Sequence, residues 1–201
     1  MNLGKIPNVL NIGPEQADNV HGRHDKDMIV LHETVSGDVA GWGDVRSISS
    51  YLDNKDYGIH GITDAEGHIA WAYGKGDAIF YHAASRGSRG NGLVNTRSMG
   101  IELISRVMLM SQDNDVRYKI WWQRQKELIA TAKLVATVAR FHGVPLVSSD
   151  SSVPGITTHW EVTMRWGVPG GHTDCWPKAA GGYFPKGRVI QLAKYYRSLG
   201  Y

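Results

Sequence analysis

The chain carries four side chains suited to a zinc site, in three widely separated places. His32 follows a run of apolar residues, His159 follows two threonines, and Asp174 and Cys175 are adjacent in a glycine-containing stretch. Zinc in proteins binds imidazole, thiolate and carboxylate groups, and a catalytic zinc keeps three such ligands and one water. Adjacent residues rarely reach the same ion, so only one of Asp174 and Cys175 is expected to bind. The set therefore predicts a zinc ion that activates water for hydrolysis.

Glu102 is an acidic residue inside an apolar run, residues 99–104. Burying an unpaired carboxylate costs free energy, so such a side chain needs either a partner or a function. As a function, Glu102 could act as the general base that takes a proton from water. As a structural alternative, it could form a salt bridge with Arg97 or Arg106. The sequence leaves both interpretations open.

Two further histidines are candidates for the same site. His60 lies in a stretch that resembles the first strand of a hairpin, and His82 follows a Phe-Tyr pair. A third histidine could complete a shell of zinc ligands, whereas the alternative for His60 is a packed or hydrogen-bonded place beside the site. The chain has no His-Glu-x-x-His spacing, which argues against a zinc site borne on a single helix.

Short apolar runs, turn residues and helical periodicity predict the elements that must position these side chains. Strands are expected at residues 28–31, 58–63, 68–71 and 99–104, the middle two forming a hairpin. Helices are expected at residues 47–52, 118–142 and 189–199. The long helix should end at Gly143. Loops are expected at residues 36–44, 82–97, 147–158 and 167–187. Mixed strands and helices favour an α/β or α+β domain.

Length and composition narrow the class of protein. A chain of 201 residues is most simply one domain, residues 28–201, preceded by an irregular N-terminal arm, residues 1–27. The single cysteine excludes an internal disulfide framework. A net charge of only +3 without a basic run argues against nucleic acid as a partner. The chain shows neither a signal-peptide pattern nor an apolar run of about 18 residues. We therefore expect a monomer, synthesised in the cytoplasm as a soluble protein without membrane insertion.

The order of these segments resembles the zinc-dependent N-acetylmuramoyl-L-alanine amidases of the amidase-2 type, which share their fold with peptidoglycan recognition proteins. The resemblance extends from Met28 to Tyr196. It is carried by a strand ending in histidine, a hairpin, a Tyr-His-Ala segment, an Asn-x-x-Ser-x-Gly-Ile-Glu segment and a Thr-x-Cys segment. These are residues 29–32, 60–67, 81–83, 95–102 and 173–175. The resemblance implies a single domain with a central mixed β-sheet flanked by helices.

The resemblance also implies a set of zinc ligands. Zinc would be held by His32, His159 and Cys175. The last segment departs from the family pattern, because Trp176 stands where the family has proline. If the alignment is shifted by one position, Asp174 replaces Cys175 as the third ligand.

Catalytic and substrate-binding roles follow from the same resemblance. Glu102 would serve as acid and base, because Ile59 occupies the place of the tyrosine that some members use. Thr173 or His172 would stabilise the oxyanion. Four residues near the motifs are expected to contact the substrate, namely Trp42, His60, Arg97 and Trp160.

The implied function is hydrolysis of the amide between N-acetylmuramic acid and L-alanine in peptidoglycan, with Zn²⁺ as the cofactor. The Gly-His-Thr-Asp-Cys segment and the later Phe-Pro pair are most similar to endolysin amidase domains of phages that infect actinobacteria. Such a protein would act on the cell wall after release. Two other functions stay open: a non-catalytic peptidoglycan-binding module, and a zinc peptidase that cuts within the stem peptide.

Overall fold

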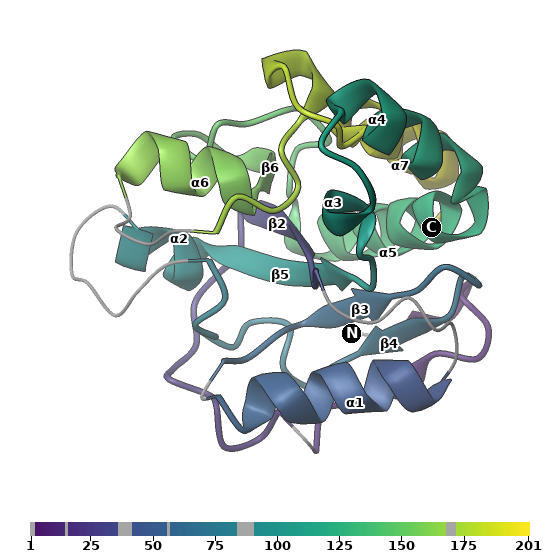
Figure 1. Ribbon diagram of the computed structural model, residues 1–201. Helices are drawn as coiled ribbons and strands as arrows, with labels where there is room; N and C mark the ends of the chain where they lie inside the picture. Colours follow the sequence, from purple (N-terminus) through teal and green to yellow (C-terminus); the bar gives the residue numbers. More distant parts are fainter. Residues whose placement is uncertain (1–2, 15, 36–41, 56, 84–90, 168–171) are drawn as a thin grey trace.

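Strand β2, which carries His32, lies between β5 and β6 in a mixed β-sheet (Figure 1). The computed structural model describes residues 3–14, 16–35, 42–55, 57–83, 91–167 and 172–201. Within these ranges the sheet has six strands in the order β1-β4-β3-β5-β2-β6. They are β1 Leu10–Asn11, β2 Met28–Glu33, β3 Gly61–Thr63, β4 Ile69–Trp71, β5 Ser98–Leu103 and β6 Gly155–Thr158. The hairpin β3–β4 is antiparallel and the other described pairs are parallel.

Successive residues of β2 point to opposite faces of the sheet, as in any strand. Ile29 and Leu31 belong to the main hydrophobic core on one face. Met28 and Val30 belong to a smaller cluster on the other face. His32 continues the second series, so the strand directs its imidazole to the face that carries the smaller cluster.

Helices cover both faces of the sheet (Figure 1). The main core is covered by α3 Val107–Met110, α4 Asn114–Gln123, α5 Gln125–His142 and α7 Lys186–Ser198. The opposite face carries α1 Trp42–Asp53, α2 Asn91–Arg97 and α6 His159–Trp166. A short 3₁₀ helix, η1 Lys178–Ala180, precedes α7. None of the helices in the described ranges has the length and apolar character needed to cross a membrane.

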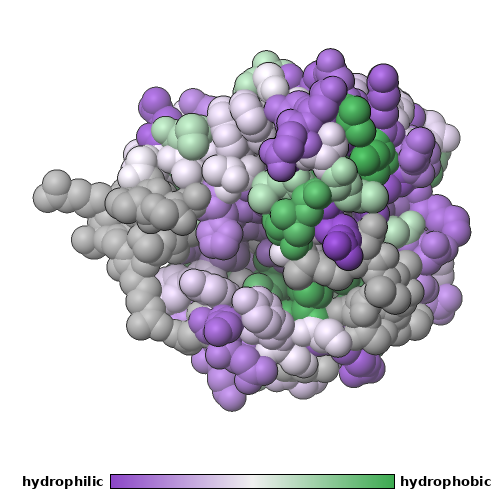
Figure 2. Space-filling model, in the orientation of Figure 1, coloured by the Kyte–Doolittle hydropathy of each residue, from purple (hydrophilic) through white to green (hydrophobic). Residues whose placement is uncertain are grey.

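The face of the molecule shown in Figure 2 is mainly hydrophilic where it is coloured, because most large apolar side chains lie in the cores on the two sides of the sheet. The apolar residues on this face gather in small groups.

The expected fold class is confirmed: the chain forms an α/β domain with a central mixed sheet and flanking helices. The strands expected at residues 28–31 and 99–104 are β2 and β5, and the expected hairpin is β3–β4. The last helix, α7, also matches its prediction, beginning three residues earlier at Lys186. These elements have strong apolar runs or periodicity, which explains why the sequence identifies them.

Two predictions in the second half of the chain were wrong. The helix expected at residues 118–142 is divided into α4 and α5, because Arg124 between them has a non-helical ψ of 47°. The loop expected at residues 147–158 ends in β6, which pairs with β2, and α6 follows at once. The side chains of Thr158 and Glu161 cap the first turn of α6 reciprocally, which is a helix-start signal that the sequence contains.

The first half of the chain also differs from expectation. Helix α1 begins at Trp42, inside the expected loop 36–44, and α2 occupies the end of the expected loop 82–97. Of the rest of these two loops, residues 36–41 and 84–90 lie outside the described residues.

The N-terminal arm is not entirely irregular. It contributes strand β1, which pairs in parallel with β4 at the edge of the sheet. Leu3 and Ile12 of the arm are buried. The arm therefore packs as part of the domain.

Leu134 of α5 tests how much the main core contributes to stability. Its side chain is fully buried, and a Cβ added to Gly61 of β3 would lie 2.8 Å from its Cδ2. Leu134→Ala should lower the free energy of unfolding by about 2–5 kcal/mol, because it removes apolar contacts and leaves a cavity. Leu109→Ala is the matched control, since that side chain is 58% exposed, and should change the value by less than about 0.5 kcal/mol. Urea titration measures the free energy of unfolding of both variants, and equal destabilisation of the two would contradict this expectation.

Candidate metal centre

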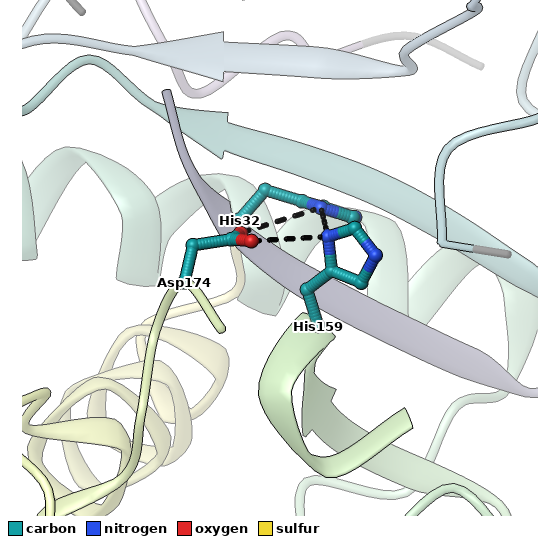
Figure 3. Close-up of side chains that lie close together, drawn as sticks. All are labelled: His32, His159 and Asp174. Carbon is teal, nitrogen blue, oxygen red and sulfur yellow. Dashed lines mark hydrogen bonds and ion pairs between the residues drawn. The ribbon is translucent and has the colours of Figure 1, made fainter. Parts of the chain in front are cut away.

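His32, His159 and Asp174 come together at the carboxyl ends of β2 and β6 (Figure 3). Leu31 pairs with Thr158 in the parallel register of these strands, so the residues that follow them, His32 and His159, lie side by side. Their Nδ1 atoms are 3.0 Å apart. Asp174 enters from the segment after α6, with Oδ1 3.2 Å from Nδ1 of His159 and Oδ2 3.7 Å from Nδ1 of His32.

Two backbone hydrogen bonds hold Asp174 in this place. The N–H of Glu33 donates to Oδ2 over 3.1 Å, and the N–H of Trp160 donates to the main-chain carbonyl of Asp174 over 3.1 Å. Strand β6 has already ended at Thr158. The carboxylate of Asp174 therefore accepts a hydrogen bond from β2 just beyond the last residue pair of β2 with β6, Leu31 and Thr158.

The donor set fits a metal ion. One donor atom from each of His32, His159 and Asp174 lies within 4.8 Å of the other two, and all three residues are buried. The two facing imidazole nitrogens leave room for no more than one proton between them. Apart from its ion-pair contact with Nδ1 of His159, buried Oδ1 of Asp174 accepts no hydrogen bond from the described residues. Buried acceptors of this kind need a compensating charge or donor, and two imidazoles with a carboxylate are a ligand set that zinc uses.

Electrostatics prepare two of these groups for metal binding. Burial lowers the pKa of His32 well below its usual value, and the neighbouring His159 and His82 lower it further. The imidazole is therefore neutral, which is the form that binds metals. Burial by itself would raise the pKa of Asp174, but the attraction of His159 and His32 and the N–H of Glu33 outweigh it and bring the pKa to about 2. The carboxylate is therefore ionised.

Cys175, predicted as the third zinc ligand, is not among the three described residues whose donor atoms converge. The backbone of Cys175 is left-handed, with φ of 55°, and its thiol is fully buried in the main core that contains Trp121 and Phe184. Burial raises the pKa of the thiol well above its usual value, and the charges of Asp174 and Glu33 raise it further. In the described residues it is Asp174, and not Cys175, that supplies a donor atom converging with those of His32 and His159.

Glu102 lies on β5 directly beside His32 on β2, and parallel neighbours in register project to the same face of the sheet. Its Oε2 is buried without a hydrogen-bond partner among the described residues. Burial raises the pKa of Glu102 well above its usual value, with a further contribution from the charge of Asp174. Neither Arg97 nor Arg106 forms an ion pair with it in the described part of the chain, so the structural alternative is not supported.

Two residues at the edge of the cluster are open to solvent. The ring of His172 stacks on that of His159, with centroids 5.0 Å apart, and its side chain is 71% exposed. Thr173 is also exposed. Both can be reached by a substrate that approaches the cluster, as their predicted role requires.

Trp160 and Arg97, two of the residues predicted to contact substrate, differ in their surroundings. Trp160 follows His159 in α6, and its indole stacks on Trp176 with centroids 5.6 Å apart. Arg97 instead binds Asp27 through two nitrogens, with Nη2 2.7 Å from Oδ2. The ion pair with Asp27 gives Arg97 a structural role different from the salt bridge with Glu102 that the sequence had suggested.

His60, which was predicted to contact substrate, lies inside the fold. The side chain is fully buried, Nε2 donates to the carbonyl of Ala78, and Nδ1 accepts from the N–H of Gly100. Both ring nitrogens are therefore engaged within the fold, as the packed alternative for His60 required. Trp42 begins α1, and its side chain lies outside the described part of the chain.

His82, which the sequence identified only as a further candidate, contacts the cluster from behind. Its Nδ1 lies 3.1 Å from Nε2 of His32, the ring nitrogen that faces away from Asp174. The Tyr-His-Ala segment was the available signal, but residue type alone could not tell a ligand from a residue behind one.

Comparison with protein families identifies the same family that the sequence resembles. Residues 22–178 match the profile of Amidase_2, N-acetylmuramoyl-L-alanine amidase. No curated protein matches the chain significantly.

Several solved structures share the fold. The chain is similar to hydrolase AmiA of Staphylococcus aureus, solved in complex with its ligand (TM-score 0.57, 16% identity, 98% of this chain and 82% of that one). It is similar to the PlyG catalytic domain (0.59, 14%, 94% and 92%). It is also similar to N-acetylmuramoyl-L-alanine amidase LysC from Clostridium intestinale URNW (0.51, 15%, 84% and 85%). At these identities the likeness establishes a common fold.

Proposed function

The chain belongs to the N-acetylmuramoyl-L-alanine amidase family, and on this basis we propose that it hydrolyses the amide between N-acetylmuramic acid and L-alanine in peptidoglycan. The observation that carries the proposal is the buried cluster of His32, His159 and Asp174 at the ends of β2 and β6. It supplies three donor atoms at the carboxyl ends of two paired strands, and family membership supplies the bond to be cut.

In the proposed reaction, water adds to the carbonyl of the lactyl group and the C–N bond breaks, which gives a carboxylate and a free L-alanine amine. A zinc ion bound to His32, His159 and Asp174 would supply the Lewis acidity that activates water and polarises the carbonyl. Glu102 takes the proton from the water and returns it to the departing amine. Glu102 is suited to this role because its carboxylate lies beside His32 and has no ion-pair partner in the described residues.

The solvent-exposed side chains beside the cluster complete the proposed site. His172 or Thr173 would donate a hydrogen bond to the developing oxyanion, where such donors contribute strongly to catalysis. Trp160, paired with Trp176, would line the groove that holds the glycan–peptide junction. We retain Trp42 as a proposed contact from its place near the motif.

We propose further that the natural context is lysis of actinobacterial cell walls by a phage endolysin. The support is the resemblance of the Gly-His-Thr-Asp-Cys segment and the later Phe-Pro pair to such amidase domains. The protein would act as a monomer, with peptidoglycan as its partner. Lysis of actinobacterial walls in preference to walls of other bacteria would support this placement, and the reverse preference would contradict it.

Digestion of purified cell wall tests the reaction itself. Mass spectrometry should detect stem peptides that begin with L-alanine beside intact glycan strands, and chelation should abolish their release because water loses its activation. Shortened peptides still attached to glycan would indicate a zinc peptidase instead. Binding to the wall without any product, by a protein that contains no metal, would indicate a recognition module.

A further inference from the structure

A chain of hydrogen bonds runs from α2 through His82 to the back of His32. The hydroxyl oxygen of Ser98 lies 2.5 Å from the carbonyl oxygen of Val94 and 3.1 Å from Nε2 of His82. The other ring nitrogen of His82, Nδ1, lies 3.1 Å from Nε2 of His32. Nδ1 of His32 in turn faces His159 and Asp174.

The directions of these hydrogen bonds follow from the chemistry of the groups. A carbonyl oxygen only accepts, so the single hydroxyl hydrogen of Ser98 must point to Val94. Ser98 can then only accept from His82, which requires the hydrogen of the His82 ring to be on Nε2. In a neutral imidazole the other nitrogen is then an acceptor.

The same logic extends to His32. Because Nδ1 of His82 accepts, Nε2 of His32 must carry the hydrogen that is donated to it. A neutral His32 with hydrogen on Nε2 has a free lone pair on Nδ1. That is the nitrogen that faces His159 and Asp174, so the chain of hydrogen bonds selects the tautomer that a metal ligand requires.

The position of His82 is itself fixed by the fold. Oδ1 of Asn95 accepts from the main-chain N–H groups of His82 and Ala83, over 3.2 and 2.9 Å. The ring lies against Gly100 of β5, where an added Cβ would come within 2.7 Å of Cγ of His82. A bulkier residue at 100 would therefore displace the ring. His82 is held at both its backbone and its ring.

We propose that His82 is a positioning residue that fixes the tautomer and orientation of His32, so that Nδ1 of His32 is presented to a metal ion. The part of the inference that concerns metal affinity rests on the proposed zinc centre. The part that concerns the tautomer of His32 does not, since it follows from hydrogen bonds within the protein. Hydrogen-bond partners behind metal-binding histidines commonly have this effect, and their loss typically reduces metal affinity by about 10- to 100-fold.

A pair of variants of similar side-chain size isolates the acceptor at Nδ1 of His82. His82→Leu removes it, whereas His82→Asn keeps an oxygen close to the same place. His82→Leu is expected to weaken zinc binding by about 10- to 100-fold, and His82→Asn should restore much of that loss. Zinc affinity is measured by competition with a chromophoric chelator, and thermal melting shows that each variant is folded. Equal affinity of the folded Leu variant and the wild type would overturn the proposal.

Nitrogen-15 NMR of the imidazoles provides a second measurement, on the full metal-free chain. The wild type should show hydrogen on Nε2 of both His32 and His82, and the Leu variant should lose this preference at His32. Hydrogen on Nδ1 of His32 in the wild type would overturn the inference, even if the Leu variant failed to fold. If the wild type bound no zinc, the proposed function would fail, and the His32 tautomer would still decide for or against His82 as its positioning residue.

Discussion

Glu102→Gln is expected to lower the rate of wall hydrolysis by about 100- to 10,000-fold, the usual contribution of a general base. Glutamine has almost the same size and can occupy the same buried place, but it cannot accept the proton of the attacking water. Glu102 is not a member of the three-residue cluster, so zinc content should stay unchanged. Product release from purified wall, metal content and thermal melting are measured on the same preparation.

Glu66→Gln is the matched control for this experiment, because Glu66 is an exposed acid that pairs with Lys126. It should leave the hydrolysis rate unchanged. Near-normal turnover by a folded Glu102→Gln protein would instead give Glu102 a structural role. The next candidates for the general base would then be Tyr57, which is exposed, and Glu161, whose carboxylate already pairs with Lys186.

Asp174→Ala is expected to remove zinc binding and hydrolysis together, whereas Cys175→Ala should keep both. The reason is that Asp174 supplies one of the three converging donors, while the thiol of Cys175 is buried in the main core. Loss of a direct ligand should weaken zinc binding by more than the roughly 10- to 100-fold that loss of a partner behind a ligand costs. Metal analysis after dialysis and wall digestion measure the two effects.

The two variants control for one another, since they alter adjacent residues. Cys175→Ala removes buried atoms and should cost about 0.5–3 kcal/mol of stability, so urea titration must show that it is folded. Loss of zinc from a folded Cys175→Ala protein would restore the thiol as the ligand. Full zinc content in Asp174→Ala would remove the carboxylate from the proposed centre.

The sequence predicts the central strands β2 and β5 of the sheet, but it does not predict β6, the strand that pairs with β2. β2 begins with four apolar residues, and β5 is mainly apolar around Glu102; such runs indicate buried strands. β6 is a stretch of four residues with two threonines and a glycine, and its own pattern is weak. It becomes a strand because β2 offers a free edge to pair with. That pairing, which places His159 beside His32, is a tertiary effect that no local pattern records.

The choice between Asp174 and Cys175 has the same origin. Residue type allows either to bind zinc, and the two are adjacent, so spacing cannot separate them. In the structure, Asp174 is held beside the two histidines by a hydrogen bond from the N–H of Glu33, a residue 141 positions away in the chain, while the backbone at Cys175 is left-handed. Glu102 was accessible from sequence because a carboxylate in an apolar run is unusual in itself.

The parallel pairing of β2 with β6 also determines when the centre can form during protein synthesis. A growing chain already contains β2 after 33 residues, but its partner strand β6 begins only at Gly155 and Asp174 comes later still. Until then β2 lacks its neighbour on one side, and an incomplete chain carries His32 without the other two donors. Contacts between such distant segments form slowly, because a long loop must close first. A chain that stops before Asp174 therefore cannot assemble the three-donor cluster, and only longer chains could hold the proposed metal ion.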